Sequence, residues 1–322
     1  MEPILSVRDL AISFDTEEGG ISAVSGVSFD LWPGRTLGLV GESGCGKSVS
    51  CHAILGLMPE NGNVERGEIL YAGRDLLRLD ERELCQIRGR EIAMIFQDPV
   101  SALNPLIRIG RQITESLRLH RGMSRRDAET EAVELLARVG IPKPAERLGA
   151  YPHELSGGMN QRIMIAMAMA CRPKVLIADE PTTALDVTIQ AQILDLIRQL
   201  QEETGMALVL VTHDLGVVAE MADEVGVMYM GRIVESGPVA SIFLNPRHPY
   251  TRGLLDSLPS IDGSKVLTPI AGSVPSPLEI PSGCAFEPRC PSAVDRCSLE
   301  VPGLRVSTVG SKFACFNPAV NS

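Results

Sequence analysis

The sequence predicts an α/β fold with a largely parallel sheet covered by helices, followed by a small extension rich in cysteine and proline. Short apolar runs alternate with helical patterns over the first 237 residues, which is typical of parallel strands joined by helical crossovers. Residues 238–322 hold 12 of the 22 prolines and four of the eight cysteines. A chain of 322 residues usually exceeds one hydrophobic core. We therefore expect a main domain over residues 1–237 and a C-terminal extension over residues 238–322.

A glycine-rich segment follows the apolar run 37–40 and precedes a helical pattern that reaches Leu57. Its sequence is Gly41-Glu42-Ser43-Gly44-Cys45-Gly46-Lys47-Ser48, which fits G-x-x-x-x-G-K-[ST] in the strand–loop–helix context that this motif requires. Such a loop points backbone N–H groups and a helix N-terminus at phosphate. Lys47 is expected to reach the β- and γ-phosphates of a nucleotide, and the Ser48 hydroxyl to ligate Mg²⁺.

Two adjacent carboxylates, Asp179 and Glu180, follow the apolar run 175–178, which reads as a strand buried on both faces. Asp179 is expected to hold Mg²⁺ through water, and Glu180 to polarise the attacking water. Without a phosphate loop, the same residues would read as an ordinary turn before Pro181. The presence of the loop favours the catalytic interpretation.

Two more polar side chains come after apolar runs. Gln97 follows the run 92–96, and His213 follows the run 207–211. In an open parallel sheet, ligands bind at the carboxyl ends of the strands, which is where both residues are expected to lie. Each also has a simpler interpretation, a surface amide for Gln97 and a helix cap for His213.

The octapeptide Leu155-Ser156-Gly157-Gly158-Met159-Asn160-Gln161-Arg162 lies between the phosphate loop and the two carboxylates. Ser156 and the two glycines begin an amphipathic helical pattern, and such an N-terminus is an anion site. Residues from about 99 to 172 replace the strand–helix alternation with consecutive helices. One of these helices is expected from Ser124, with a capping-box-like start, to Gly140. A later helix, Thr188 to Thr204, is expected to stop at Gly205.

In this order, the motifs resemble those of the nucleotide-binding subunits of ATP-binding-cassette (ABC) importers, from the first strand to about Gly237. The resemblance implies a P-loop NTPase fold with a helical subdomain at about 99–172 and an antiparallel β part. It implies that Phe14 stacks on adenine, that Gln97 belongs to the Q-loop and joins the magnesium ligands, and that His213 is the switch histidine.

The resemblance also concerns a partner. It implies that Ser156, Gly157 and Gly158 bind the γ-phosphate held by the opposite subunit, so that hydrolysis needs two cassettes. Ala184-Leu185-Asp186 matches the D-loop. The segment 97–105 is implied to dock on the transmembrane permease.

The segments Arg247–Thr251 and Gly283–Pro291 resemble the tail of one subgroup, the dipeptide/oligopeptide permease ATP-binding subunits. That subgroup implies uptake of short peptides, with a second, related ATP-binding subunit, two transmembrane permease subunits and, indirectly, an extracytoplasmic peptide-binding protein. Other cargo remains open, namely nickel, glutathione or an opine-like compound. A non-transport ABC ATPase acting on nucleic acid or ribosomes is the alternative from another class.

Four cysteines of the extension, Cys284, Cys290, Cys297 and Cys315, have the spacing C-x5-C-x6-C-x17-C. Four thiolates in a segment with little core suggest a metal site. The spacing is loose for Zn²⁺ and acceptable for a [4Fe–4S] cluster, which the resemblance to relatives with this tail also implies. Disulfides are disfavoured in a reducing cytoplasm, and four unliganded thiols remain the simplest alternative.

The net charge of −10 and the lack of clustered lysine and arginine argue against binding to nucleic acid or anionic lipid. The longest apolar stretch, Ile163–Cys171, is far too short to span a membrane, and the N-terminus lacks the pattern of a signal peptide. We therefore expect an intracellular protein that associates peripherally with the cytoplasmic face of the cell membrane through its permease.

Overall fold

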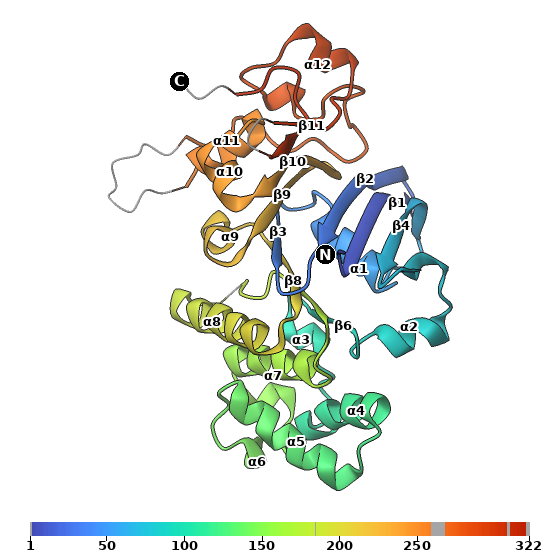
Figure 1. Cartoon of the computed structure of the whole chain (residues 1–322), viewed down its shortest axis with the longest axis vertical. Helices are drawn as coiled ribbons and strands as arrows, with labels where there is room; N and C mark the ends of the chain where they lie inside the picture. Colours follow the sequence, from blue (N-terminus) through green and yellow to red (C-terminus); the bar gives the residue numbers. More distant parts are fainter. Residues whose placement is uncertain (1, 184, 259–267, 308–309, 320–322) are drawn as a thin grey trace. The chain divides into compact units, whose positions relative to one another are not determined.

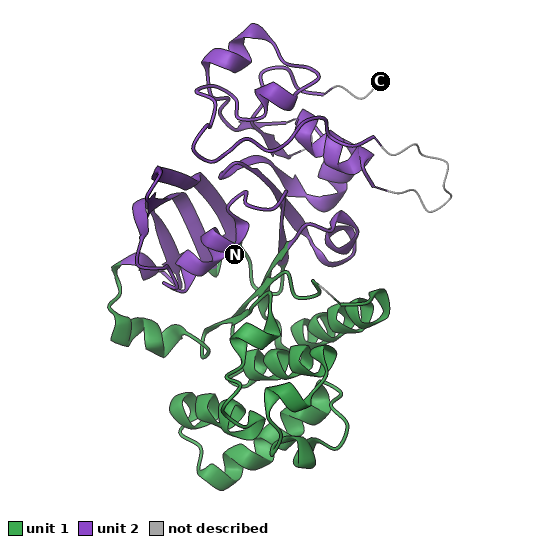
Figure 2. Cartoon of the chain, turned by 180° about the vertical axis from the view of Figure 1, so that it is seen from behind, with its two compact units in different colours: residues 1–4, 31–35, 78–211 green, residues 5–30, 36–77, 212–322 purple. Residues whose placement is uncertain are grey.

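The computed structural model describes residues 2–183, 185–258, 268–307 and 310–319, and the chain forms two compact units (Figure 1, Figure 2). Unit 1 contains residues 1–4, 31–35 and 78–211, and unit 2 contains residues 5–30, 36–77 and 212–322. Each unit combines β-sheet with helices, which confirms the predicted α/β class.

Unit 1 contains the parallel strands β6 (Ile92–Ile95), β7 (Val175–Asp179) and β8 (Ala207–Thr212), with β7 in the middle. β6 and β8 both pair in parallel with β7. The apolar side chains of all three strands are buried, as predicted for strands covered on both faces. Their carboxyl ends therefore lie at one edge of this part of the sheet.

The helices of unit 1 are α2 (Glu81–Ile87), α3 (Pro99–Ala102), α4 (Ile109–Arg121), α5 (Arg125–Arg138), α6 (Pro144–Arg147), η2 (Pro152–Glu154), α7 (Gly157–Met169) and α8 (Val187–Thr204). The run of helices from α3 to α7 confirms the predicted interruption of the strand–helix alternation. Within it, α4, α5 and α7 pack against one another (Figure 1). The hydroxyl of Ser124 accepts a hydrogen bond from Asp127 N–H (3.2 Å) and caps α5, as its sequence predicted.

Unit 2 begins with an antiparallel sheet of four strands in the order β2-β1-β4-β5. Its strands are β1 (Leu5–Thr16), β2 (Gly19–Leu31), β4 (Gly62–Tyr71) and β5 (Arg74–Asp75). Unit 2 also contains β3 (Thr36–Val40), which pairs in parallel with β9 (Glu224–Tyr229), and β10 (Arg232–Pro238), which is antiparallel to β9. The helices near these strands are α1 (Lys47–Ile54), η1 (Leu76–Arg78) and α9 (Leu215–Met221). α1 ends three residues before the predicted end at Leu57, because Gly56 adopts a left-handed conformation (φ 61°).

The C-terminal extension packs onto the strands of unit 2. It contains α10 (Val239–Leu244), α11 (Pro249–Asp256), η3 (Glu287–Arg289), α12 (Asp295–Leu299), β11 (Arg305–Val306) and β12 (Lys312–Phe313), and β12 pairs with β10. Three buried rings, Tyr229 of β9, Tyr250 of α11 and Phe286, form its core with centroids 4.7–5.3 Å apart. Across the residues that the structure describes, no helix is both long and apolar enough to cross a membrane.

A buried histidine stands at the start of α11. His248 is 1% exposed, and its Nδ1 accepts a hydrogen bond from Tyr250 N–H (3.1 Å), so the ring is a neutral helix cap. Burial lowers the pKa of His248 from 6.5 to about 4. Between these values the unfolded chain binds a proton that the folded chain does not bind, so folding becomes less favourable as the pH falls.

We expect the free energy of unfolding to decrease by about 3 kcal/mol through His248 as the pH falls from 6.5 to about 4. His248→Asn keeps a cap acceptor but does not titrate, so its unfolding free energy should lack this component. Urea unfolding of both proteins at a series of pH values measures the difference. Parallel pH profiles for the two proteins would contradict the prediction.

Candidate active site

The glycine-rich segment forms the turn between β3 and α1, as predicted. Lys47, 5% exposed, lies back over the turn, and its Nζ donates hydrogen bonds to the carbonyl oxygens of Gly41 (2.8 Å) and Glu42 (3.0 Å). The N-cap of α1 is Gly46, which has no side chain to cap the helix. The turn thus combines an ammonium group with an N-terminal helix end, both of which attract phosphate.

Two glycines of this turn lie against neighbouring backbone. A Cβ atom at Gly46, where φ is 97°, would lie 2.5 Å from the carbonyl oxygen of Ala23, and one at Gly41 would lie 2.2 Å from that of Met228. Gly44 differs, because a Cβ atom there would have no neighbour within 4 Å. The turn is therefore packed on one side and open on the other, which fits a cradle for phosphate groups.

In unit 1, the two predicted carboxylates end β7. Asp179 is the last residue of the strand and is 3% exposed. Glu180 follows it in a left-handed conformation (φ 46°), and its N–H donates to the carbonyl oxygen of Val211 on β8 (2.9 Å). A residue other than glycine in this region costs about 1–2 kcal/mol. Such strain at a non-glycine residue is frequent where a side chain must be aimed at a reacting group.

The structure brings Gln97 and Glu180 together, although 83 residues separate them. Gln97 Nε2, just beyond the end of β6, donates a hydrogen bond to Glu180 Oε2 (3.1 Å). The same oxygen accepts a hydrogen bond from the hydroxyl of Thr183 (2.7 Å). These two bonds orient the carboxylate. Gln97 is exposed, as the surface-amide interpretation predicted, and it also engages Glu180 at the strand ends.

Sequence reasoning missed two residues that support this corner. Thr183 was not named from the sequence, and Gln161 was named only as part of the octapeptide. Gln161 is 2% exposed, and its Nε2 donates to the carbonyl oxygen of Pro181 (2.6 Å), so α7 directly contacts the turn after Glu180. The signal was present in the sequence, since an amide in an otherwise apolar helix needs a buried partner.

The octapeptide forms the start of α7 as predicted. The Ser156 hydroxyl accepts a hydrogen bond from Met159 N–H (3.4 Å) and caps the helix. Ser156 and Gly157 are exposed, Gly158 is half-buried, and a Cβ atom at Gly157 would meet nothing within 4 Å. This helix end is thus accessible to a group from outside the chain.

The remaining predicted residues belong to unit 2, apart from the D-loop, of which Ala184 lies outside the described residues. Phe14 is a half-buried residue of β1, opposite Gly62 of β4. His213 is exposed between β8 and α9. The interpretation of His213 as a helix cap is wrong, because Asp214 caps α9 by accepting from Gly216 N–H (2.8 Å).

The donor atoms fit a nucleotide with Mg²⁺. In unit 2, backbone N–H groups and Lys47 suit the phosphates, and the hydroxyl of Ser48 is a hard oxygen donor of the kind that Mg²⁺ prefers. In unit 1, the carboxylate of Asp179 is another donor of this kind. When bound, Mg²⁺ would neutralise charge that develops on the phosphates.

The four cysteines of the extension fit a metal less well than the oxygen donors described above fit Mg²⁺. Cys284 N–H donates to the carbonyl oxygen of Cys297 (2.7 Å), which joins two of their segments. Burial raises the pKa of the Cys315 thiol to about 11, and the charges of the other three thiols add to this. All four thiols are free, and the described part of the chain has no group of three or more His, Cys, Asp or Glu arranged to hold a metal ion. The structure therefore does not support the predicted [4Fe–4S] cluster or its Zn²⁺ alternative.

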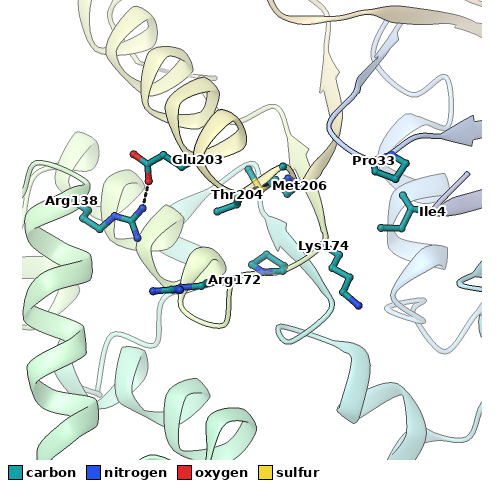
Figure 3. Close-up of a pocket in the computed structure, with 10 residues that line it drawn as sticks. Ile4, Pro33, Arg138, Arg172, Lys174, Glu203, Thr204 and Met206 are labelled. Atoms are coloured by element: carbon teal, nitrogen blue, oxygen red, sulfur yellow. Dashed lines mark hydrogen bonds and ion pairs between the residues drawn. The ribbon is translucent and has the colours of Figure 1, made fainter. Parts of the chain in front are cut away.

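A pocket of about 600 Å³ opens at the amino-terminal ends of β7 and β8 in unit 1 (Figure 3). Arg138, Arg172 and Lys174 line it, and Arg138 forms an ion pair with Glu203. The catalytic candidates of unit 1 follow the carboxyl ends of the strands. The pocket is therefore not part of the candidate site.

Comparison with known proteins identifies the class to which this fold and these motifs belong. The family model described as "ABC transporter" matches residues 24–183. Solved cassettes resemble the chain, and two of them serve as examples. The ATP-binding cassette MJ0796, a dimer bound to ADP and Pi, has a TM-score of 0.66 and 28% identity, and the match covers 73% of this chain and 98% of that one. CbiO1 from Clostridium perfringens has a TM-score of 0.64 and 25% identity, covering 76% and 92%.

The likeness to particular relatives extends over nearly the whole chain. The model described as "Oligopeptide/dipeptide transporter, C-terminal region" matches residues 234–297. The dipeptide transport ATP-binding protein DppD of Bacillus subtilis is 51% identical over 98% of this chain and 95% of its own length. The oligopeptide transport ATP-binding protein OppD of Salmonella typhimurium is 49% identical over 98% and 94%. The chain belongs to the family of ABC-transporter ATP-binding proteins, and it is an ATPase coupled to transport.

The close packing of the phosphate loop leads to a stability prediction. Gly46→Ala should destabilise the protein clearly more than Gly44→Ala, because the added methyl group collides with backbone only at position 46. Gly44→Ala should cost about 1–2 kcal/mol, since its left-handed conformation alone is strained. Urea unfolding without nucleotide measures both. Equal losses of unfolding free energy in the two variants would contradict the prediction, because the backbone around position 46 would then have moved to accommodate the methyl group.

Proposed function

We propose that this chain is the ATP-hydrolysing subunit of an ABC importer that takes up di- and oligopeptides. One observation carries the proposal: the chain matches the ABC transporter family and, after it, the C-terminal region of oligopeptide/dipeptide transporters. Its relatives DppD and OppD are 51% and 49% identical to it over 98% of its length. The relatives that match in this way are named for dipeptide and oligopeptide transport. Transport of nickel is an outcome of the experiment below, and glutathione is the other alternative cargo.

Within this proposal, each part of the site has a role. Lys47 and the N–H groups of residues 41–48 bind the phosphates, Ser48, Gln97 and Asp179 hold Mg²⁺, and Phe14 stacks on adenine. Glu180 accepts a proton from the attacking water, and its carboxylate is oriented for this by Gln97 and Thr183. The imidazole of His213 contacts the γ-phosphate. This assignment is supported by the position of Gln97, Asp179 and Glu180 at the carboxyl ends of parallel strands.

A second cassette completes the proposed site. Ser156, Gly157 and Gly158 donate to the γ-phosphate held by the phosphate loop of a related but distinct subunit. The exposure of Ser156 and Gly157 supports this role. The open monomer then hydrolyses ATP slowly, because closure of the pair supplies the missing donors.

The proposed permease partners give the subunit its place at the cytoplasmic face of the cell membrane, with an extracytoplasmic peptide-binding protein as an indirect partner. The segment 97–105 is the proposed docking segment. Val100, 66% exposed on α3, and Leu106, 85% exposed just after the segment, support this, because exposed apolar side chains favour a protein contact. We also propose that the cassette ends near residue 237, close to where the match to the C-terminal region begins.

The catalytic assignment predicts the behaviour of Glu180→Gln. This variant should bind ATP within about twofold of the wild type and hydrolyse it about 10²–10⁴-fold more slowly, because the base is lost while the phosphate contacts remain. ATP binding and hydrolysis are measured in the assembled transporter. Glu134→Gln, the same change at an exposed position of α5, is the control and should leave both unchanged. Rapid hydrolysis by Glu180→Gln would refute the assignment.

The transport proposal is tested with the same variants. Uptake of labelled di-, tri- and pentapeptides and of nickel is measured in cells that carry the wild-type chain, Glu180→Gln or Glu134→Gln as the only copy. Entry of one peptide class with wild type and Glu134→Gln, but not with Glu180→Gln, supports the proposal. Loss of nickel uptake alone would show a different cargo.

We propose, as a separate hypothesis, a [4Fe–4S] cluster on Cys284, Cys290, Cys297 and Cys315, supported by their number and by the hydrogen bond that joins the segments of Cys284 and Cys297. Protein purified without oxygen should then contain four iron and four sulfide per chain, about the content of one such cluster, and lose both on Cys290→Ser. Protein with neither iron nor sulfide excludes the cluster, and bound zinc would replace it.

A further inference from the structure

One arginine of the C-terminal extension contacts the side chain of a residue in the phosphate loop. Arg289, in η3, places both arms of its guanidinium on the carboxylate of Glu42, with Nη1 2.8 Å from Oε2 and Nη2 3.1 Å from Oε1. The two residues are 247 positions apart in the chain and lie in the same unit. A bidentate pair of this kind fixes orientation as well as charge.

Arg289 is itself held in place. Its side chain is 4% exposed, its Nε donates to the carbonyl oxygen of Ala271 (3.0 Å), and its guanidinium lies 5.9 Å from the ring centroids of Tyr229 and Phe286. The paired carboxylate raises the pKa of Arg289, so the group is charged at all working pH values. A buried guanidinium needs a carboxylate, and here Glu42 provides it.

A second contact fixes the backbone of Glu42. Its N–H donates to the hydroxyl of Tyr250 (3.0 Å), a residue of α11 that is fully buried against Tyr229 and Phe286. The carbonyl oxygens of Glu42 and of the preceding Gly41 accept the hydrogen bonds of Lys47. The extension thus holds the stretch of loop that positions the phosphate-binding lysine.

Charge gives the pair a second effect. Glu42 is an acid in a loop that receives a polyanion, and an unpaired carboxylate there would repel the phosphates. Arg289 neutralises it at contact distance. Removing Arg289 would release the loop and restore the repulsion at the same time.

We infer that Arg289 is a positioning residue for the phosphate loop, through which the C-terminal extension sets the affinity of the cassette for ATP. This inference rests on the proposed binding of ATP phosphates by residues 41–48. Arg289 acts through Glu42 and does not touch the nucleotide. Linkage makes the effect reciprocal, so bound ATP stabilises the fold of the extension around Arg289.

A double-mutant cycle on the full chain tests the inference, with the dissociation constant of ATP–Mg²⁺ as the readout. Arg289→Ala should weaken binding roughly tenfold or more, because Glu42 is left loose and charged. Glu42→Gln combined with Arg289→Ala should bind better than Arg289→Ala alone, because the repulsion is gone. Arg289→Lys keeps the positive charge but cannot form the bidentate contact with Glu42, so its affinity for ATP should lie between those of wild type and Arg289→Ala.

Arg296→Ala is the matched control. It removes another arginine of the extension that pairs with a glutamate, Glu300, but that pair is exposed and lies outside the loop contacts. Its ATP affinity should equal that of the wild type. Thermal unfolding of each variant shows whether it folds. If Arg289→Ala does not fold, Arg289→Lys decides the outcome, and affinity equal to the wild type would overturn the inference.

A merely structural role predicts a different pattern. Arg289→Ala would then lower the unfolding temperature while binding ATP within about twofold of the wild type, with no rescue by Glu42→Gln, and the inference would be wrong. Lys47→Ala separates this failure from that of the proposed site. If Lys47→Ala loses ATP binding and Arg289→Ala does not, only the role of Arg289 fails. If Lys47→Ala binds ATP like the wild type, the assignment of the loop fails with it.

Discussion

A turn between a strand and a helix can bind a polyphosphate through its backbone N–H groups only where no side chain fills the turn. This constraint explains the glycines at both ends of the phosphate loop, each of which lies too close to neighbouring backbone for a Cβ atom. It also explains why Lys47 is buried yet satisfied, since its ammonium group bonds two carbonyl oxygens of the loop itself. The conformation of the loop depends on contacts from outside it as well, such as that of Glu42 N–H with the hydroxyl of Tyr250.

The surroundings include the C-terminal extension. Tyr250 and Arg289 bind the backbone and the side chain of Glu42, and the aromatic core of Tyr229, Tyr250 and Phe286 keeps both groups in place. The extension is small and rich in proline, so it has little core of its own and gains stability by packing on β9 and β10. In this arrangement, the part of the chain that distinguishes the peptide-transporter relatives also supports the part that is common to cassettes.

The backbone and side chain of Glu180 are also fixed by residues from other parts of the chain. Its left-handed backbone is held by a hydrogen bond to β8, and its carboxylate is oriented by Gln97 and Thr183. Gln161 of α7 donates a hydrogen bond to the carbonyl oxygen of Pro181, so the helix that Ser156 caps contacts the turn after Glu180. A shift of α7 would therefore change the contact of Gln161 with Pro181, the residue that follows the proposed catalytic base.

The sequence by itself determined the strand that ends in Asp179, the strands that precede Gln97 and His213, the glycine loop, the run of helices and the start of α7. These features depend on local periodicity, on glycine conformations and on helix caps, which neighbouring residues decide. The antiparallel sheet came only from resemblance to a family, because its half-exposed strands lack a strong pattern. Only the tertiary structure decided that Arg289 meets Glu42, that Thr183 and Gln97 share one oxygen of Glu180, and that Asp214 and not His213 caps α9. The first two contacts join residues far apart in the chain or across a turn, and such pairs are fixed by how the elements pack and not by any local pattern.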